Sequence, residues 1–225
     1  MIKLVAFDWN GTLLSDSLTA TNADNKVLTE FGLKPITLQK FRECFDMPIQ
    51  KYWVSLGFDE KFFLANSKTI HWNFNKYYEP MADKCRTRAG ARELLKYLKQ
   101  EKIGAVIYSN HIIPAIEKQL KRLKLNNYFE QILARPSEHD FSHMHNRSKE
   151  QKLVDYIKKH KLKPEEVLSV GDTEEEIEIG KQHGFYTAAI TGGYNTAARL
   201  KKHKPDFLIH TLRSLVTTVK NINYL

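Results

Sequence analysis

Residues 7–12 read Phe-Asp-Trp-Asn-Gly-Thr, and this stretch follows a short apolar run that begins at Ile2. The β-branched and aromatic content of that run, with no turn residue inside it, predicts a buried strand. A carboxylate where such a strand ends points out of the carboxyl edge of a sheet, which is where open α/β folds bind ligands. Asp8 is therefore a candidate nucleophile or metal ligand. The alternative is an Asp that only caps the turn.

The chain has 225 residues, enough for one domain with a sizeable insertion and a proper core. No apolar run approaches the ~20 residues of a membrane-spanning helix, so we expect no membrane partner. Asp8 interrupts the only apolar run near the start, which argues against a signal peptide and favours a cytoplasmic location. Cys44 and Cys85 lie far apart without a C-x-x-C pair, so neither a disulfide framework nor a zinc site is predicted.

The formal net charge of +9 leaves room for a nucleic-acid partner. The lysines, however, are spread along helix-like faces, and no arginine-rich tract or aromatic recognition motif accompanies them. We therefore expect a solvated basic surface and no nucleic-acid partner. Such a surface would also suit a small anionic substrate.

The chain changes character along its length. Residues 16–85 are rich in aromatic side chains at three- and four-residue spacing, which predicts an all-helical insertion with its own core. Gly32, Pro35, Pro48 and Gly57 should divide it into several helices of modest length. From Gly90 onwards, apolar strands alternate with amphipathic helices. This alternation predicts an α/β fold, with a parallel sheet covered by helices on both faces.

Three of the predicted strand ends carry polar residues. Asp8 and Asn10 follow the first strand, Ser109 and Asn110 follow the strand over 103–108, and Asp172 follows the strand over 167–170. In a parallel sheet these ends lie at one edge, so residues a hundred positions apart should converge. Two carboxylates and a backbone carbonyl form an oxygen-only site suited to Mg²⁺.

The sequence resembles the haloacid dehalogenase-like phosphohydrolase superfamily, most closely its phosphoglycolate phosphatase-like members. Four segments carry the resemblance: D-W-N-G-T (8–12), Y-S-N (108–110), S-K-E-Q-K (148–152) and G-D-T-E-E-E-I (171–177). The insertion falls where such proteins carry a helical cap over the active site. The resemblance implies a Rossmann-like core domain of residues 1–15 and 86–225, with residues 16–85 as the cap domain.

The resemblance also implies roles for single residues. Asp8 would be the nucleophile and form an aspartyl-phosphate. Mg²⁺ would be bound by the carboxylates of Asp8 and Asp172 and by the backbone carbonyl of Asn10. The groups implied to bind the phosphoryl group are Ser109, Asn110, Gly11, Thr12 and a lysine.

That lysine is Lys149 or Lys152. We expect Lys149, because it lies nearer the start of its helix and so nearer the sheet edge. In the cap, Lys51 and Arg42 are candidates for contact with the substrate. The expected partner is a small phosphorylated metabolite, and the expected state is a monomer or homodimer.

Two positions depart from the family pattern. The second residue of the usual D-x-D motif is an acid–base Asp, whereas Asn10 can donate a hydrogen bond but cannot exchange a proton. Acid–base catalysis increases the rate of a reaction by about 10²–10⁴-fold. A slow phosphatase and a catalytically weak phospho-ligand-binding protein are therefore both alternatives. Glu176 replaces the usual Asp of the fourth motif. With Thr173 it would also form a helix-capping box, and that role explains it as well as one near a metal.

A second enzymatic alternative is C–P bond cleavage of the phosphonoacetaldehyde hydrolase type. Those proteins resemble this chain in having Asp-Trp and a non-acidic residue before Gly-Thr. They also carry a Schiff-base lysine four residues after a Met in the cap, a spacing that Met47 and Lys51 match. A third motif, the histidines at 139, 143 and 145, is expected to lie in a loop at the rim of the site and not to bind a metal.

Overall fold

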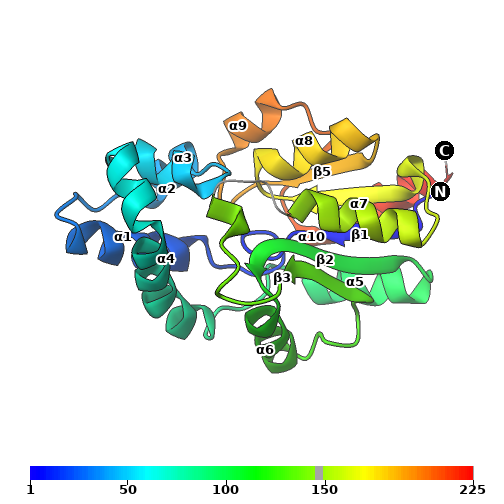
Figure 1. Ribbon diagram of the computed structural model, residues 1–225. Helices are drawn as coiled ribbons and strands as arrows, with labels where there is room; N and C mark the ends of the chain where they lie inside the picture. The colour runs from blue at the N-terminus through cyan, green and yellow to red at the C-terminus, as the bar shows by residue number, and fades with distance from the viewer. Residues whose placement is uncertain (145–148, 225) are drawn as a thin grey trace.

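The computed structural model describes residues 1–144 and 149–224. Its strands are β1 (Leu4–Phe7), β2 (Gly104–Ile112), β3 (Gln131–Arg135), β4 (Val167–Gly171), β5 (Tyr186–Ile190) and β6 (Phe207–Ile209). Within the described residues they form one parallel sheet in the order β3-β2-β1-β4-β5-β6. The predicted α/β fold is confirmed. The strand β1, which ends one residue before Asp8, lies in the middle of the sheet between β2 and β4 (Figure 1).

Helices cover both faces of the sheet, because alternate side chains of each strand point to opposite faces. Val5 and Phe7 join the apolar core formed with α5 (Ala91–Gln100), α6 (Ile113–Leu123) and α10 (Leu212–Tyr224). Leu4 and Ala6 join the core formed with α7 (Lys149–Lys159) and α8 (Glu174–His183). A short helix that the sequence did not predict, α9 (Ala197–Lys202), packs beside α8.

The insertion, residues 16–85, contains α1 (Ser17–Glu30), α2 (Leu38–Cys44), α3 (Ile49–Ser55) and α4 (Glu60–Ala82). These helices lie together beyond the carboxyl ends of the strands (Figure 1) and share an apolar core, which Met144 and Tyr194 also join. The prediction of modest helix lengths is wrong for α4, which has 23 residues. No Gly or Pro interrupts it before Pro80 in its last turn. The separate cap domain over 16–85 stays a prediction.

The strand that carries the second motif also differs from expectation. The sequence predicted a strand that ends at Tyr108, but β2 continues to Ile112. Its register against β3 shifts between Tyr108 and Ile112. Ser109 and Asn110 therefore lie in the irregular part of a strand and not beyond its end.

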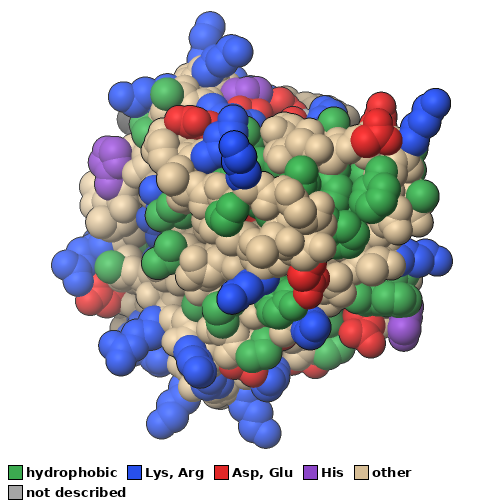
Figure 2. All heavy atoms as spheres, turned by 90° about the vertical axis from the view of Figure 1, so that its left-hand side faces the viewer, with side chains coloured by type: hydrophobic (Ala, Val, Ile, Leu, Met, Phe, Trp, Pro, Cys, Tyr) green, Lys and Arg blue, Asp and Glu red, His purple; other side chains and the backbone are tan. Residues whose placement is uncertain are grey.

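The molecular surface is mixed in charge. Figure 2 shows Lys and Arg side chains around the outer face of the insertion, interspersed with acidic and apolar side chains. Within residues 1–144 and 149–224, no helix is both long enough and apolar enough to span a membrane.

Candidate active site

The carboxyl edge of the sheet brings the strand-end residues together. Asp8, Asn10, Ser109 and Asn110 all line one cavity, which we call the site cavity. Lys149, the first residue of α7, lines it as well, and its Nζ lies 3.2 Å from Asp8 Oδ1. Residues from the turn after β1, from β2 and from α7 thus meet at the end of β1.

Lys149 is the electrostatic centre of this site. Its side chain is 2% exposed, and it forms ion pairs with Asp8, Glu175 and Glu176. Burial favours the neutral amine, but the three carboxylates outweigh that effect and hold the pKa of Lys149 well above its usual value. The other candidate, Lys152, is half-buried and does not line the cavity.

Burial also acts on the nucleophile candidate. It raises the pKa of the Asp8 carboxyl, and the charges of Glu176 and Asp172 raise it further, whereas Lys149 lowers it. The ion pair with Lys149 is therefore what favours the charged carboxylate that a nucleophile needs. Asp8 itself is only 6% exposed.

Glu176 has two structural roles at once. Its Oε2 accepts hydrogen bonds from the backbone N–H and the hydroxyl of Thr173, so the predicted capping box at the start of α8 is confirmed. Its Oε1 pairs with Lys149. A Cβ at Gly171 would lie 2.0 Å from Cγ of Glu176, so only glycine lets this side chain reach across to the lysine.

Asp172, which was predicted to converge with Asp8, is fully buried and does not line the site cavity. Its two oxygens accept hydrogen bonds from the Thr12 hydroxyl and the Tyr194 backbone N–H. Burial, together with the charge of Glu176, raises the pKa of Asp172 to about 7. A Cβ at Gly11 or Gly193 would approach Asp172 Oδ2 to 2.2 Å, so two glycines keep the space beside this oxygen clear.

Asp16, which sequence reasoning missed, organises the first motif. It is 1% exposed, and Asn10 Nδ2 donates to its Oδ2 at 2.8 Å. The backbone N–H of Gly11 donates to Oδ1, and the hydroxyls of Tyr78 and Tyr194 donate to Oδ2. Burial raises the pKa of Asp16. The sequence feature that could have identified Asp16 is its position, six residues after Asn10 and at the start of the insertion.

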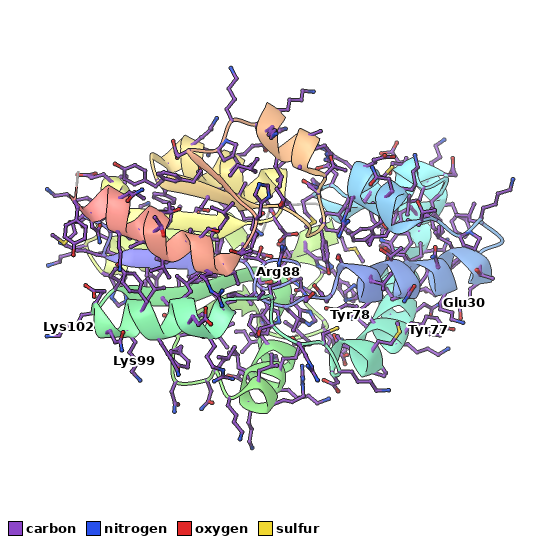
Figure 3. All side chains as sticks on the ribbon, turned by 180° about the vertical axis from the view of Figure 1, so that it is seen from behind. Glu30, Tyr77, Tyr78, Arg88, Lys99 and Lys102 are labelled. Carbon is purple, nitrogen blue, oxygen red and sulfur yellow. The ribbon has the colours of Figure 1, made fainter. Side chains whose placement is uncertain are left out.

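This network changes the expectation for two phosphate-binding candidates. The Gly11 N–H is bonded to Asp16, and the Thr12 hydroxyl is bonded to Asp172. Neither residue lines the site cavity. The turn also receives Arg88, which donates to the carbonyl of Gly11 at 2.7 Å. Figure 3 shows Arg88 beside the sheet and Tyr78 on α4, at the junction between sheet and insertion.

The insertion side of the cavity is mainly aromatic. Its lining includes Phe41, Phe45, Tyr52, Trp53, Phe74 and Tyr78. Three titratable groups of the cavity lining, Asp24 and His71 from the insertion and His111 from β2, are shifted towards their uncharged forms by burial. Burial raises the pKa of Asp24 to about 8 and lowers that of His71 to about 4 and that of His111 to about 3.

The two cap candidates do not reach the cavity. Lys51 is exposed, and neither it nor Arg42 lines the site cavity. Arg42 instead donates to the backbone carbonyls of Gly192 and Gly193, at 2.9 Å each. It thereby ties α2 to the loop after β5.

A second buried cation, besides Lys149, lines the site cavity. It is Arg135, which no sequence motif indicated. It ends β3, lines the cavity and donates to the Asn110 carbonyl at 2.7 Å. Burial lowers its pKa to about 10. The sequence feature that could have identified Arg135 is a polar residue at a strand end. Of the rim histidines, His143 is buried in the cavity lining, His139 is exposed, and position 145 lies outside the described residues.

No three His, Cys, Asp or Glu side chains among residues 1–144 and 149–224 are grouped so as to hold a metal ion. The predicted Mg²⁺ ligands comprise only two side-chain carboxylates, with a backbone carbonyl as the third.

The comparisons with known proteins agree with this geometry. The haloacid dehalogenase-like hydrolase family matches residues 5–190. The chain belongs to this family. It is a haloacid dehalogenase-like hydrolase, and its similarity to the phosphoglycolate phosphatase-like members is confirmed by relatives of that name.

Two relatives and one solved structure illustrate the similarity. Phosphoglycolate phosphatase 1 of Pseudomonas aeruginosa is 24% identical over 232 residues, covering 95% of this chain and 78% of that protein. Pyrophosphatase PpaX of Bacillus cereus is 29% identical over 132 residues, 58% of each chain. The crystal structure of a predicted phosphatase from Clostridium acetobutylicum has a TM-score of 0.82 at 17% identity, covering 98% of this chain and 99% of that one. At that identity it supports the fold alone.

Proposed function

We propose that this hydrolase is a Mg²⁺-dependent phosphatase that acts on a small phosphorylated metabolite through an aspartyl-phosphate on Asp8. The observation that carries the proposal is the contact between the Asp8 carboxylate and Lys149, at 3.2 Å, in a cavity that Ser109 also lines. A carboxylate can act as the nucleophile of a covalent intermediate, and a buried cation and a hydroxyl can bind the phosphoryl oxygens.

The reaction can be written with this chain's own residues. A carboxylate oxygen of Asp8 attacks phosphorus, and the bond between phosphorus and the leaving-group oxygen breaks. The leaving group departs as an anion, which takes any proton from water. Lys149 neutralises charge on the phosphoryl oxygens, and Ser109 and Asn110 donate hydrogen bonds to them. Water then attacks the aspartyl-phosphate, which releases inorganic phosphate and restores the carboxylate.

The residues present fit Mg²⁺. The donor set consists of hard oxygens, which this ion prefers, and the glycines at 11 and 193 keep the space beside Asp172 Oδ2 free of side chains. The carboxylates of Asp8 and Asp172 and the carbonyl of Asn10 would hold the ion. When bound, Mg²⁺ would offset the negative charge of the two carboxylates and of the phosphoryl group.

The relatives provide precedents for the substrate. Their names include phosphoglycolate phosphatases and a pyrophosphatase, so a small phosphate compound is the proposed substrate class. Because Asn10 cannot protonate a leaving group, the chain should favour aryl and acyl phosphates, whose leaving groups need little protonation.

One alternative retains support from a specific observation. Asn10 lines the cavity at the position of the usual acid–base residue, which favours a catalytically weak phospho-ligand-binding protein. C–P cleavage would need the Lys51 amine beside the substrate, and that residue is exposed and outside the cavity lining.

A phosphate-release screen over alkyl, aryl and acyl phosphates, with and without Mg²⁺, tests the proposal. Turnover should require Mg²⁺ and should disappear in Asp8→Asn. Borohydride, which reduces an aspartyl-phosphate to homoserine and releases phosphate, should convert Asp8 of acid-quenched wild-type enzyme to homoserine, detected by mass spectrometry. Phosphate binding without turnover of any substrate would favour the alternative of a binding protein.

A further inference from the structure

Glu175 contacts two of the residues that line the site cavity, Lys149 and Asn110. Although it belongs to the first turn of α8, its side chain is 3% exposed and faces the site cavity. One oxygen, Oε2, lies 3.1 Å from Lys149 Nζ and accepts a hydrogen bond from Asn110 Nδ2 at 2.9 Å. Lys149 and Asn110 are two of the groups that the proposed function assigns to the phosphoryl oxygens.

The three glutamates in this turn are placed differently. Glu174 pairs with Arg199, outside the cavity lining. Glu176 is held by the capping hydrogen bonds from Thr173. Glu175 contributes only its backbone N–H to the cap, which donates to the Thr173 hydroxyl at 3.3 Å, so its side chain is not held there. Its carboxylate lies instead on two donors to which an anionic ligand would bind.

We propose that the Glu175 carboxylate is a resident anion in the phosphoryl site, which a bound phosphate must displace from Lys149 and Asn110. Glu175 thereby sets the affinity of this chain for phosphate and for phosphorylated substrates. The proposal rests on the proposed function, because that function places phosphate beside Asp8.

The charges around Lys149 give the reason for a large effect. One ammonium group is shared among Asp8, Glu175 and Glu176, so the cluster is already negative before a phosphate arrives. A phosphate adds charge of the same sign within a few ångströms, in a buried site where screening by salt is weak. Glu175 is the carboxylate in this cluster that acts neither as the proposed nucleophile nor as a helix cap.

The chain offers a matched pair of variants. Glu175→Gln and Glu174→Gln each remove one negative charge from the same helical turn and keep the side-chain length. Only the first removes charge from the site cavity. The affinity for inorganic phosphate is measured by isothermal titration calorimetry with the full chain in Mg²⁺-containing buffer. Glu175→Gln should bind phosphate roughly tenfold or more tightly than wild type, whereas Glu174→Gln should match wild type.

A third variant separates charge from bulk and protects the test against misfolding. In Glu175→Asp the shorter carboxylate should reach Lys149 and Asn110 less well, so its affinity should lie between those of wild type and Glu175→Gln. Thermal melts of all variants check folding.

Each remaining outcome is decisive. Equal or weaker phosphate binding by folded Glu175→Gln, with clear binding by wild type, overturns the role of Glu175 and leaves the proposed function standing. Absence of phosphate binding by every variant overturns both.

Discussion

The side-chain amide of Asn10 donates a hydrogen bond to the buried carboxylate of Asp16 at 2.8 Å. The same amide nitrogen donates to the Tyr78 hydroxyl at 2.6 Å. A carboxylate at position 10 would face a second carboxylate at this distance, whereas an amide provides the donor that Asp16 needs. Asn10, which departs from the family motif, thus provides a hydrogen-bond donor to Asp16. Variants of these two residues can therefore be tested together.

Asn10→Asp should accelerate alkyl-phosphate hydrolysis by about tenfold or more, within the ~10²–10⁴-fold range of acid–base catalysis. Two carboxyl groups this close share a proton, which supplies the missing acid at neutral pH. The measurement is kcat for an alkyl phosphate relative to an aryl phosphate, whose leaving group needs little protonation and should gain little. Asp8→Asn should silence both the wild type and the variant.

The same variant should be less stable than wild type, because it places like charges together in a buried site. Adding Asp16→Asn restores a single carboxylate to the pair and should recover the melting temperature. If Asn10→Asp hydrolyses alkyl phosphates no faster than wild type, proton donation is not the limiting step.

Mg²⁺ should raise the melting temperature of the wild-type protein. An ion that binds only the folded state stabilises it by mass action, by about 2.7 kcal/mol at one hundred times its dissociation constant. Asp172→Asn should abolish most of the shift. Asp59→Asn changes the exposed N-cap residue of α4 to another residue that can cap a helix. This variant should keep the full shift in melting temperature. An unshifted wild-type melt would contradict the Mg²⁺ site.

Asp24 should make the free energy of unfolding fall as pH rises. Burial raises its pKa to about 8 in the folded protein, and the unfolded value is about 3.9. Between these pH values the folded state holds a proton that the unfolded state has lost. The contribution of Asp24 to the free energy of unfolding is therefore fully present below about pH 4 and is lost as the pH rises to about 8. Urea unfolding of Asp24→Asn across this range should lack this contribution.

Tyr52 provides a control for that assignment. Its hydroxyl donates to Asp24 Oδ2 at 2.6 Å, which lowers the pKa of the carboxyl. Tyr52→Phe should therefore extend the decline in stability to higher pH. The same pH dependence in wild type and Asp24→Asn would show that another group is responsible.

Lys51 should form no imine with phosphonoacetaldehyde. Because its side chain is exposed and lies outside the cavity lining, an aldehyde bound near Asp8 would not meet it. Borohydride added with phosphonoacetaldehyde should leave Lys51 unmodified in a peptide map, and Lys51→Arg should match wild type in every phosphatase assay. A reduced adduct on this residue would revive C–P cleavage.

Much of the architecture could be predicted from local patterns. Short apolar runs alternating with amphipathic helices predicted the parallel sheet and the helices that cover both of its faces. The convergence of Asp8 and Ser109 also followed from the sequence, because the carboxyl ends of parallel strands share one edge. Asp172, predicted at the same edge, does not line the cavity, and Lys149 was implied only by the family resemblance. Local periodicity and chain direction suffice for such inferences.

Only the tertiary structure decided which hydrogen bonds these residues make. Asp16 collects donors from the first turn, from α4 and from the loop after β5, which are up to 178 positions away. Glu175 reaches Lys149 on α7 and Asn110 on β2 only once α8 packs on β4 and β5. A buried carboxylate must find its partners among whatever packing brings near it. Those partners come from distant segments, so no local pattern in the sequence identifies them.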